Sequence, residues 1–255
     1  MRAEPRLESG ELSAPPPFNP LRHALFLDLD GTLAPIASDP AAVTLDADAR
    51  DVIMRATSAS GGAVAILTGR TVADADRILR MRLPHIAGTH GLELRAGAVT
   101  TSAGYNAAAL RAAIRDVQAH FSRGAAPRLE DKGASIALHY RHAPDLEAPL
   151  RNVAQRTAAR RGLRTLEGKM VIELLAAAGT KADALRAFMS APPFTGRTPV
   201  AIGDDVTDEA AFEAAQSTGG VAVLVGERRQ TTAAHHLADP SAVIAWIAAG
   251  LERAP

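Results

Sequence analysis

Three absences limit what this chain of 255 residues can be. It has no cysteine, which excludes disulfides and thiolate metal sites and leads us to expect a cytoplasmic protein. Lysine plus arginine and aspartate plus glutamate number 28 each, so no excess charge is available for a nucleic acid or an anionic membrane. No apolar run approaches the roughly 18 residues that a membrane span requires. These absences favour a protein that handles a small molecule.

Short apolar runs alternate with amphipathic segments in two parts of the chain, and apolar residues make up 47% of the whole. The expected strands are 24–27, 63–67, 86–88, 198–202 and 221–225, and the expected helices are 45–60, 72–81, 181–189, 208–215 and 241–251. This alternation predicts right-handed crossovers and a doubly wound, Rossmann-like parallel α/β sheet. Residues 1–20 are polar and rich in proline and lack the apolar segment of a signal peptide, so we expect a flexible tail there.

The middle of the chain has a different pattern. A hairpin is expected at 92–101 around Gly97, and an amphipathic helix at 106–121. A strand-like stretch at 128–141, a further helix and a strand pair ending at 175 follow. We therefore expect an α+β domain at 105–177, inserted into a catalytic core formed by 21–104 and 178–255.

Three strands of the predicted core end in polar side chains. The residues at these ends are Asp28 and Asp30, Thr68 and Arg70, and Asp204, Asp205 and Asp208. The carboxyl ends of parallel strands lie along one edge of a sheet, so we expect one cleft there. Asp28 and Asp30 point to the same side of an extended chain, and a hard cation such as Mg²⁺ would relieve their repulsion.

Simpler interpretations exist for each of these segments alone. An Asp-x-Asp-Gly segment also occurs in turns and calcium loops. An EF-hand loop beginning at Asp28 would need glycine at position 33 and glutamate at position 39, but this chain has Leu33 and Asp39 there. Asp204, Asp205 and Asp208 are also residue types that cap helices. The occurrence of all the segments in order, each at a strand end, favours phosphoryl transfer instead.

Four segments together resemble the ordered motifs of the haloacid dehalogenase-like hydrolase superfamily, most of whose members are Mg²⁺-dependent phosphatases. They are Asp28-Leu29-Asp30-Gly31-Thr32-Leu33, Leu67-Thr68-Gly69-Arg70, Lys181 and Gly203-Asp204-Asp205-Val206-Thr207-Asp208. The resemblance implies that Asp28 is a nucleophile that forms an aspartyl-phosphate and that Asp30 is the general acid and then the general base. Thr68 would bind the phosphoryl oxygens.

The same resemblance implies the metal ligands and a phosphate-binding lysine. Asp28, Asp204 and the backbone carbonyl of Asp30 would hold Mg²⁺, with Asp208 in or near the metal shell. Lys181 would hold the phosphate and Asp28 in place. The family often has glycine after this lysine, whereas Ala182 follows Lys181, so Lys169 is a rival. The position of Lys169 inside an expected strand favours Lys181.

Strand parity predicts which side chains of the inserted domain face a substrate. Alternate apolar residues in 135–141 and 169–175 share one face, which amphipathic helices would cover. The other face would carry Glu130, Lys132, His139, Arg141, Lys169 and Glu173. A solvated sheet face is the simpler interpretation, but a neighbouring phosphatase core favours a sugar-binding surface.

Several segments resemble the trehalose-6-phosphate phosphatases, and the resemblance extends from about residue 22 onward. The segments are Thr89-His90-Gly91, Glu130-Asp131-Lys132, His139-Tyr140-Arg141, Gly168-Lys169-Met170-Val171-Ile172-Glu173 and Gly203-Asp204-Asp205-Val206-Thr207-Asp208-Glu209. The resemblance implies that Glu130, Lys132 and Glu173 bind glucose hydroxyls, supported by His139, Arg141 and Lys169. It also adds Gly69, Arg70 and His90 to the substrate-binding set. Leu29 and Thr68 stand where this family commonly has tyrosine and serine.

Two alternatives remain open at this stage: a phosphatase of sucrose phosphate or of a glycosyl-phosphoglycerate, and a non-catalytic sugar-phosphate sensor. An intact set of nucleophile, acid, lysine and metal ligands argues against a sensor. His235 and His236 have no carboxylate at ligand spacing, so we assign them no metal. We expect a monomer.

Overall fold

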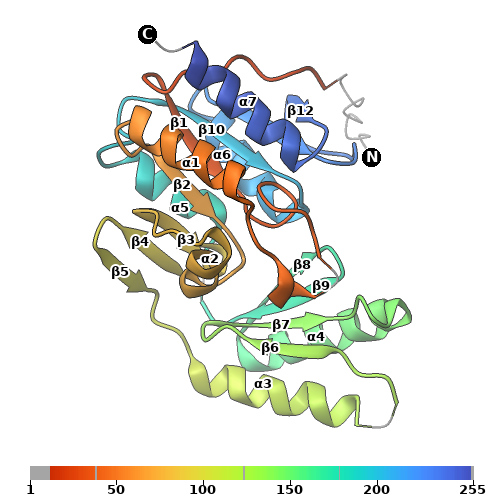
Figure 1. The fold of residues 1–255 in the computed structure, drawn as a ribbon. Coiled ribbons are helices and arrows are strands. Elements are labelled where there is room, and N and C mark those ends of the chain that lie inside the picture. Colours follow the sequence, from red (N-terminus) through yellow and green to blue (C-terminus); the bar gives the residue numbers. More distant parts are fainter. Residues whose placement is uncertain (1–11, 38, 123, 178, 254–255) are drawn as a thin grey trace, which may run out of the picture.

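The computed structural model describes residues 12–253 except 38, 123 and 178, and its larger sheet has eight strands in the order β12-β11-β10-β1-β2-β3-β4-β5 (Figure 1). The strands are β1 (His23–Leu27), β2 (Val64–Leu67), β3 (His85–Gly88), β4 (Glu93–Ala96), β5 (Val99–Ser102), β10 (Thr198–Gly203), β11 (Val221–Val225) and β12 (His235–Leu237). Every pairing from β12 to β3 is parallel, and β4 and β5 add an antiparallel hairpin at one edge. The predicted doubly wound sheet is confirmed.

Helices cover both faces of this sheet. Leu25 and Leu27 of β1 pack in a layer with α1 (Ala47–Ala59), α2 (Val72–Leu79) and α7 (Pro240–Glu252). The alternate residues Ala24 and Phe26 pack with α5 (Lys181–Met189) and α6 (Glu209–Gln216). Burial on both faces is the reason why these strands are continuous apolar runs in the sequence. None of the helices in the described part of the chain is long and apolar enough to cross a membrane.

A second sheet is antiparallel, with the order β6-β7-β9-β8. Its strands are β6 (Arg128–Asp131), β7 (Ser135–His139), β8 (Arg164–Gly168) and β9 (Val171–Leu175). We call this sheet with α3 (Ala107–His120) and α4 (Glu147–Arg161) the cap, and the larger sheet with its helices the core. Ile136, Leu138, Ile172 and Leu174 pack against the two helices, as parity predicts. Figure 1 shows α3 on the side of the cap sheet away from the core, so the polar face is turned toward the core.

Two details of the cap differ from the sequence prediction. The stretch 128–141 forms two strands rather than one, because Asp131 accepts a hydrogen bond from the backbone of Gly133 and Gly133 has a φ of +79°. Only glycine adopts such a conformation without strain, so a turn forms there. Lys169 lies in the turn between β8 and β9 rather than inside a strand.

The N-terminal segment also differs from the expectation of a flexible tail at 1–20. Phe18 is buried beside Trp246 of α7, whose indole nitrogen donates to the Pro16 carbonyl at 3.0 Å. Ser13 forms a bridge to His235 in β12, an edge strand that the sequence pattern did not predict. Apolar contact with α7 and hydrogen bonds to an open strand edge hold residues 13–18 in place. Residues 1–11 lie outside the described part of the chain.

Candidate functional site

The three predicted strand ends meet as expected. Asp28 and Asp30 follow β1, Thr68 follows β2 and Asp204 follows β10, and β10, β1 and β2 are neighbours in the sheet. A cavity of about 510 Å³ lies between this edge and the polar face of the cap. Every predicted site residue except Asp208 lines it: Asp28, Asp30, Thr68, Gly69, Arg70, His90, Glu130, Lys132, His139, Arg141, Lys169, Glu173, Lys181 and Asp204.

Lys181 joins two carboxylates at the floor of the cavity. It is the first residue of α5, and its Nζ lies 2.6 Å from Asp28 Oδ1 and 2.7 Å from Asp208 Oδ1. All three side chains are buried. Burial raises the pKa of Asp28 well above its usual range, with Asp208 and Asp204 adding to the shift, although Lys181 opposes it. One ammonium is therefore not enough to balance the negative charge gathered here.

Asp204 adds a third carboxylate, and the three acids together fit a divalent cation. One oxygen each from Asp28, Asp204 and Asp208 lies within 4.8 Å of the others. Asp204 Oδ1 is buried without a hydrogen-bond partner, and burial, with Asp208 and Asp205 nearby, raises the pKa of Asp204 to about 7. An unpartnered buried carboxylate oxygen costs free energy that a cation would recover. A Cβ at Gly31, whose φ is +85°, would collide with the Asp204 carboxylate, so glycine keeps this space open.

Asp208 uses both of its oxygens within the protein. Oδ1 accepts from Lys181, while Oδ2 accepts from the backbone N–H groups of Asp204 and Asp205 at 3.1 Å each. The bond from the Asp205 N–H is one half of the capping box of the short helix Val206–Asp208. Asp208 thus shapes the loop that presents Asp204 and also lies at the edge of the acidic cluster.

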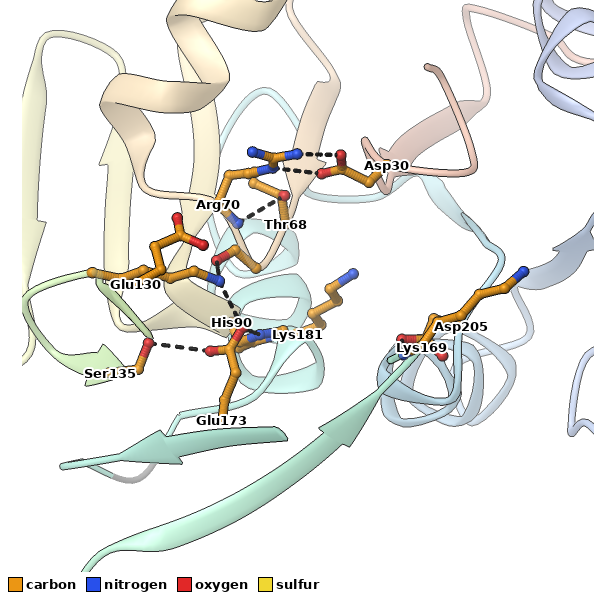
Figure 2. Close-up of polar contacts among 12 residues, drawn as sticks. Asp30, Thr68, Arg70, His90, Glu130, Ser135, Lys169, Glu173, Lys181 and Asp205 are labelled. Atoms are coloured by element: carbon orange, nitrogen blue, oxygen red, sulfur yellow. Dashed lines mark hydrogen bonds and ion pairs between the residues drawn. The ribbon is translucent and has the colours of Figure 1, made fainter. Parts of the chain in front are cut away.

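Asp30 is paired with Arg70. Its two oxygens accept from Arg70 Nε at 2.8 Å and Nη2 at 2.6 Å, and Thr68 Oγ1 accepts from the Arg70 backbone at 3.1 Å (Figure 2). The three residues from β1 and β2 are thus fixed relative to one another. The predicted role of Asp30 in the metal site falls to its backbone carbonyl, and its side chain lies outside the group of Asp28, Asp204 and Asp208.

Glu173 is the centre of a buried network on the cap (Figure 2). Its carboxylate lies 2.6 Å from Lys132 Nζ, 3.1 Å from Ser135 Oγ and 3.3 Å from His90 Nε2, and Lys132 also donates to the Gly69 carbonyl at 2.9 Å. Burial alone would raise the pKa of Glu173, but Lys132 and His90 outweigh it and hold the pKa well below its usual range. His90 and Gly69 belong to the core, so this network joins cap and core.

The remaining cap residues surround this network. His139 Nε2 lies 2.7 Å from Glu130, and this bond lowers the pKa of Glu130 despite partial burial. Arg141 donates to the backbone carbonyl of Ala37 in the core at 3.5 Å. Lys169 donates through its backbone N–H to Asp205 at 3.2 Å.

Sequence reasoning missed Ser135 and the contact made by Asp205. Ser135 shares parity with His139, so the alternation that identified the polar face contained a signal for it. Ile36 and Val43 also line the cavity, from the irregular chain after β1, where no periodicity marks them.

Comparison with known proteins agrees with this geometry. The family model described as trehalose-phosphatase matches residues 26–241. The chain is 36% identical over 247 residues to the trehalose-6-phosphate phosphatase of Escherichia coli K12, and the aligned region covers 96% of this chain and 90% of that protein. It is 38% identical over 205 residues to a probable trehalose-phosphate phosphatase of Sinorhizobium fredii, with 80% and 77% covered. A solved structure of a trehalose-6-phosphate phosphatase related protein is similar with a TM-score of 0.72 and 28% identity, over 88% of this chain and 95% of that one. The chain therefore belongs to the trehalose-phosphatase family of phosphoric monoester hydrolases.

Proposed function

We propose that this protein is a Mg²⁺-dependent phosphatase that hydrolyses trehalose 6-phosphate to trehalose and phosphate through an aspartyl-phosphate. One observation carries the proposal: the buried pair Lys181 and Asp28, with the half-buried Asp204 beside it, faces across one cavity a sheet with paired acids and bases. The named activities of the similar proteins support the choice of substrate.

In this mechanism Asp28 attacks phosphorus and the ester bond to the sugar oxygen breaks. Lys181 holds Asp28 in place and offsets negative charge as the phosphoryl group is transferred. Thr68, fixed by its bond to the Arg70 backbone, binds a phosphoryl oxygen. Water then attacks the phosphorus of the aspartyl-phosphate, releases inorganic phosphate and restores Asp28.

Asp30 handles the proton in both steps. It gives a proton to the departing sugar oxygen and later takes one from the attacking water. Because Arg70 occupies both oxygens of Asp30 in this structure, Arg70 has to shift before that transfer. An anionic phosphate entering the cavity provides a competing partner for the guanidinium.

The acidic cluster would hold the metal through Asp28, Asp204 and the backbone carbonyl of Asp30, with Asp208 at its edge. A bound Mg²⁺ supplies charge neutralisation for the phosphoryl group and for the two carboxylates. The unpartnered oxygen of Asp204 and the raised pKa of Asp28 support this assignment.

The cap provides the sugar-binding surface. Glu130, Lys132 and Glu173 offer charged acceptors and donors that suit sugar hydroxyls, with His139, Arg141 and Lys169 beside them. A cap seated on the core excludes bulk water from the reaction. The domain limits 21–104, 105–177 and 178–255, a cytoplasmic location and a monomeric state stay predictions.

The test is a comparison of kcat/KM across sugar phosphates with Mg²⁺ present. We expect trehalose 6-phosphate to exceed sucrose 6-phosphate, a glucosyl-phosphoglycerate and glucose 6-phosphate by at least about a hundredfold, which corresponds to about 3 kcal/mol of differential binding. Chelation should abolish turnover and Mg²⁺ should restore it. Equal or faster turnover of another sugar phosphate would overturn the choice of substrate.

A further inference from the structure

The cap also contacts the core through the turn between β8 and β9, apart from the Glu173 network and the bond from Arg141 to Ala37. The turn between β8 and β9 rests on the loop that carries Asp204, where the backbone N–H of Lys169 donates to Asp205 Oδ2 at 3.2 Å (Figure 2). Asp205 was recognised in the sequence only as part of a strand-end motif. Nothing in the proposed chemistry uses its side chain.

The turn is built for a close approach to that carboxylate. A Cβ on Gly168 would lie 2.9 Å from Asp205 Oδ2, closer than real Cβ atoms come, so glycine lets the turn approach. Met170 has a φ of +63°, a left-handed conformation that costs a residue with a side chain on the order of 1 kcal/mol. The contact with the core helps to hold the turn in this shape.

Asp205 connects this turn directly to the catalytic loop. Its other oxygen, Oδ1, accepts from the Val206 backbone at 2.7 Å and caps the short helix Val206–Asp208. Asp208 in the same helix holds Lys181. One side chain therefore joins the cap turn to the loop that positions Asp204 and Lys181.

Lys169 is the charged residue of the turn, and it lines the cavity beside Met170. Its charge acts to lower the pKa of Asp204, against the larger effect of burial. Its backbone, rather than its ammonium, makes the contact with Asp205. The contact therefore fixes the position of the Lys169 backbone and leaves its ammonium available to a ligand in the cavity.

We propose that Asp205 is a positioning residue: its carboxylate receives the β8–β9 turn, seats the cap on the core and holds Lys169 over the substrate cavity. The activity readouts below rest on the proposed function, whereas the distance measurement does not.

The substitution Asp205→Asn should break the hydrogen bond with the Lys169 N–H and keep the one with the Val206 N–H. Asparagine caps helices well, so its Oδ1 keeps the Val206 bond while its NH₂ group meets the Lys169 N–H as a second donor. Gly168→Ala disturbs the same contact from the cap side, and it serves if the first variant folds poorly. Lys169→Ala is the control, because it removes the ammonium and keeps the backbone N–H.

The kinetic test is a double-mutant cycle. We expect Asp205→Asn to raise KM for trehalose 6-phosphate about tenfold more than KM for p-nitrophenyl phosphate, which lacks the sugar. If Asp205 acts by placing Lys169, adding Asp205→Asn to Lys169→Ala should change KM by less than about twofold. Multiplicative effects in the double variant would overturn the proposal.

The second readout follows the cap without using activity. Because the chain has no cysteine, spin labels can be attached at Met54→Cys on α1 and Gln155→Cys on α4, both exposed positions, and their distance distribution measured. We expect Asp205→Asn and Gly168→Ala to broaden the distribution and Lys169→Ala to leave it unchanged. An unchanged distribution in the first two variants would overturn the proposal. Broadening in a protein that hydrolyses no sugar phosphate would uphold the seating and refute the proposed function.

Discussion

At the scale of single residues, the proposed chemistry depends on a buried lysine between two carboxylates. Lys181 contacts Asp28 and Asp208, whereas Lys169, its rival from the sequence, is exposed in a cap turn. Breaking a buried ion pair leaves an uncompensated charge, while an exposed charge contributes little. The two lysines should therefore respond very differently to the same substitution.

Lys181→Met should lower kcat for p-nitrophenyl phosphate by about a thousandfold, because it removes a buried donor next to Asp28. Lys169→Met, the matched control, should change kcat by less than about tenfold. Steady-state kinetics of both variants, with circular dichroism to confirm folding, gives the comparison. A larger loss of kcat in Lys169→Met than in Lys181→Met would show that Lys169, rather than Lys181, is the phosphate-binding lysine.

Glu173 makes a prediction about pH and stability. Its pKa in the folded protein lies below the ordinary value of 4.5, so its stabilising contribution is complete above about pH 4.5 and is lost as the pH falls further. Glu173→Gln, which leaves Lys132 buried without an opposite charge, should reduce the free energy of unfolding by about 3–5 kcal/mol at pH 7. The difference from the parent protein should shrink below pH 4.5. Urea unfolding between pH 7 and pH 3.5 measures it, and a difference independent of pH would contradict this origin.

At the scale of elements, the core strands were predictable and the cap turns were not. A strand buried on both faces must be apolar, as β1 is from Ala24 to Leu27, so its end at Asp28 is visible in the sequence. The turn after β6 depends on one bond from Gly133 to Asp131, and the β8–β9 turn on a left-handed methionine. Local hydrogen bonds and tertiary contacts, rather than periodicity, decide such places.

The polar segments at the edge of the core were unpredictable for a related reason. β12 is only His235–Leu237, and its bonds to β11 and to Ser13 involve the backbone or a single hydroxyl. The candidate site was also predictable only in part. Strand parity identified Glu130 and Glu173, whereas the contact of Asp205 with Lys169 forms only when cap and core meet.

The N-terminal segment makes a prediction at this scale. Phe18 is 2% exposed and packs against α7, so Phe18→Ala should lower the free energy of unfolding by about 3–5 kcal/mol. Leu21→Ala is the control, because Leu21 is 62% exposed and its loss should cost less than about 0.5 kcal/mol. Equal effects in chemical denaturation would show that the segment does not stabilise the core.

At the scale of the whole molecule, the proposed function assigns the reaction to the core and the choice of substrate to the cap. The core contributes Asp28, Asp30, Lys181 and Asp204, and the cap contributes the polar sheet face opposite them. Every step assigned to the core follows from one claim, that Asp28 attacks phosphorus while Asp30 moves protons.

Trapping the phosphorylated enzyme tests that claim most directly. In Asp30→Asn, p-nitrophenyl phosphate can still phosphorylate Asp28, because its leaving group departs without a proton, whereas attack by water lacks its base. After acid quenching and proteolysis, mass spectrometry should find one phosphoryl group on the peptide that contains Asp28. The group should be absent from the variant that also carries Asp28→Asn. A burst of p-nitrophenol with no phosphoryl group on Asp28, or with the group on another residue, would contradict the mechanism.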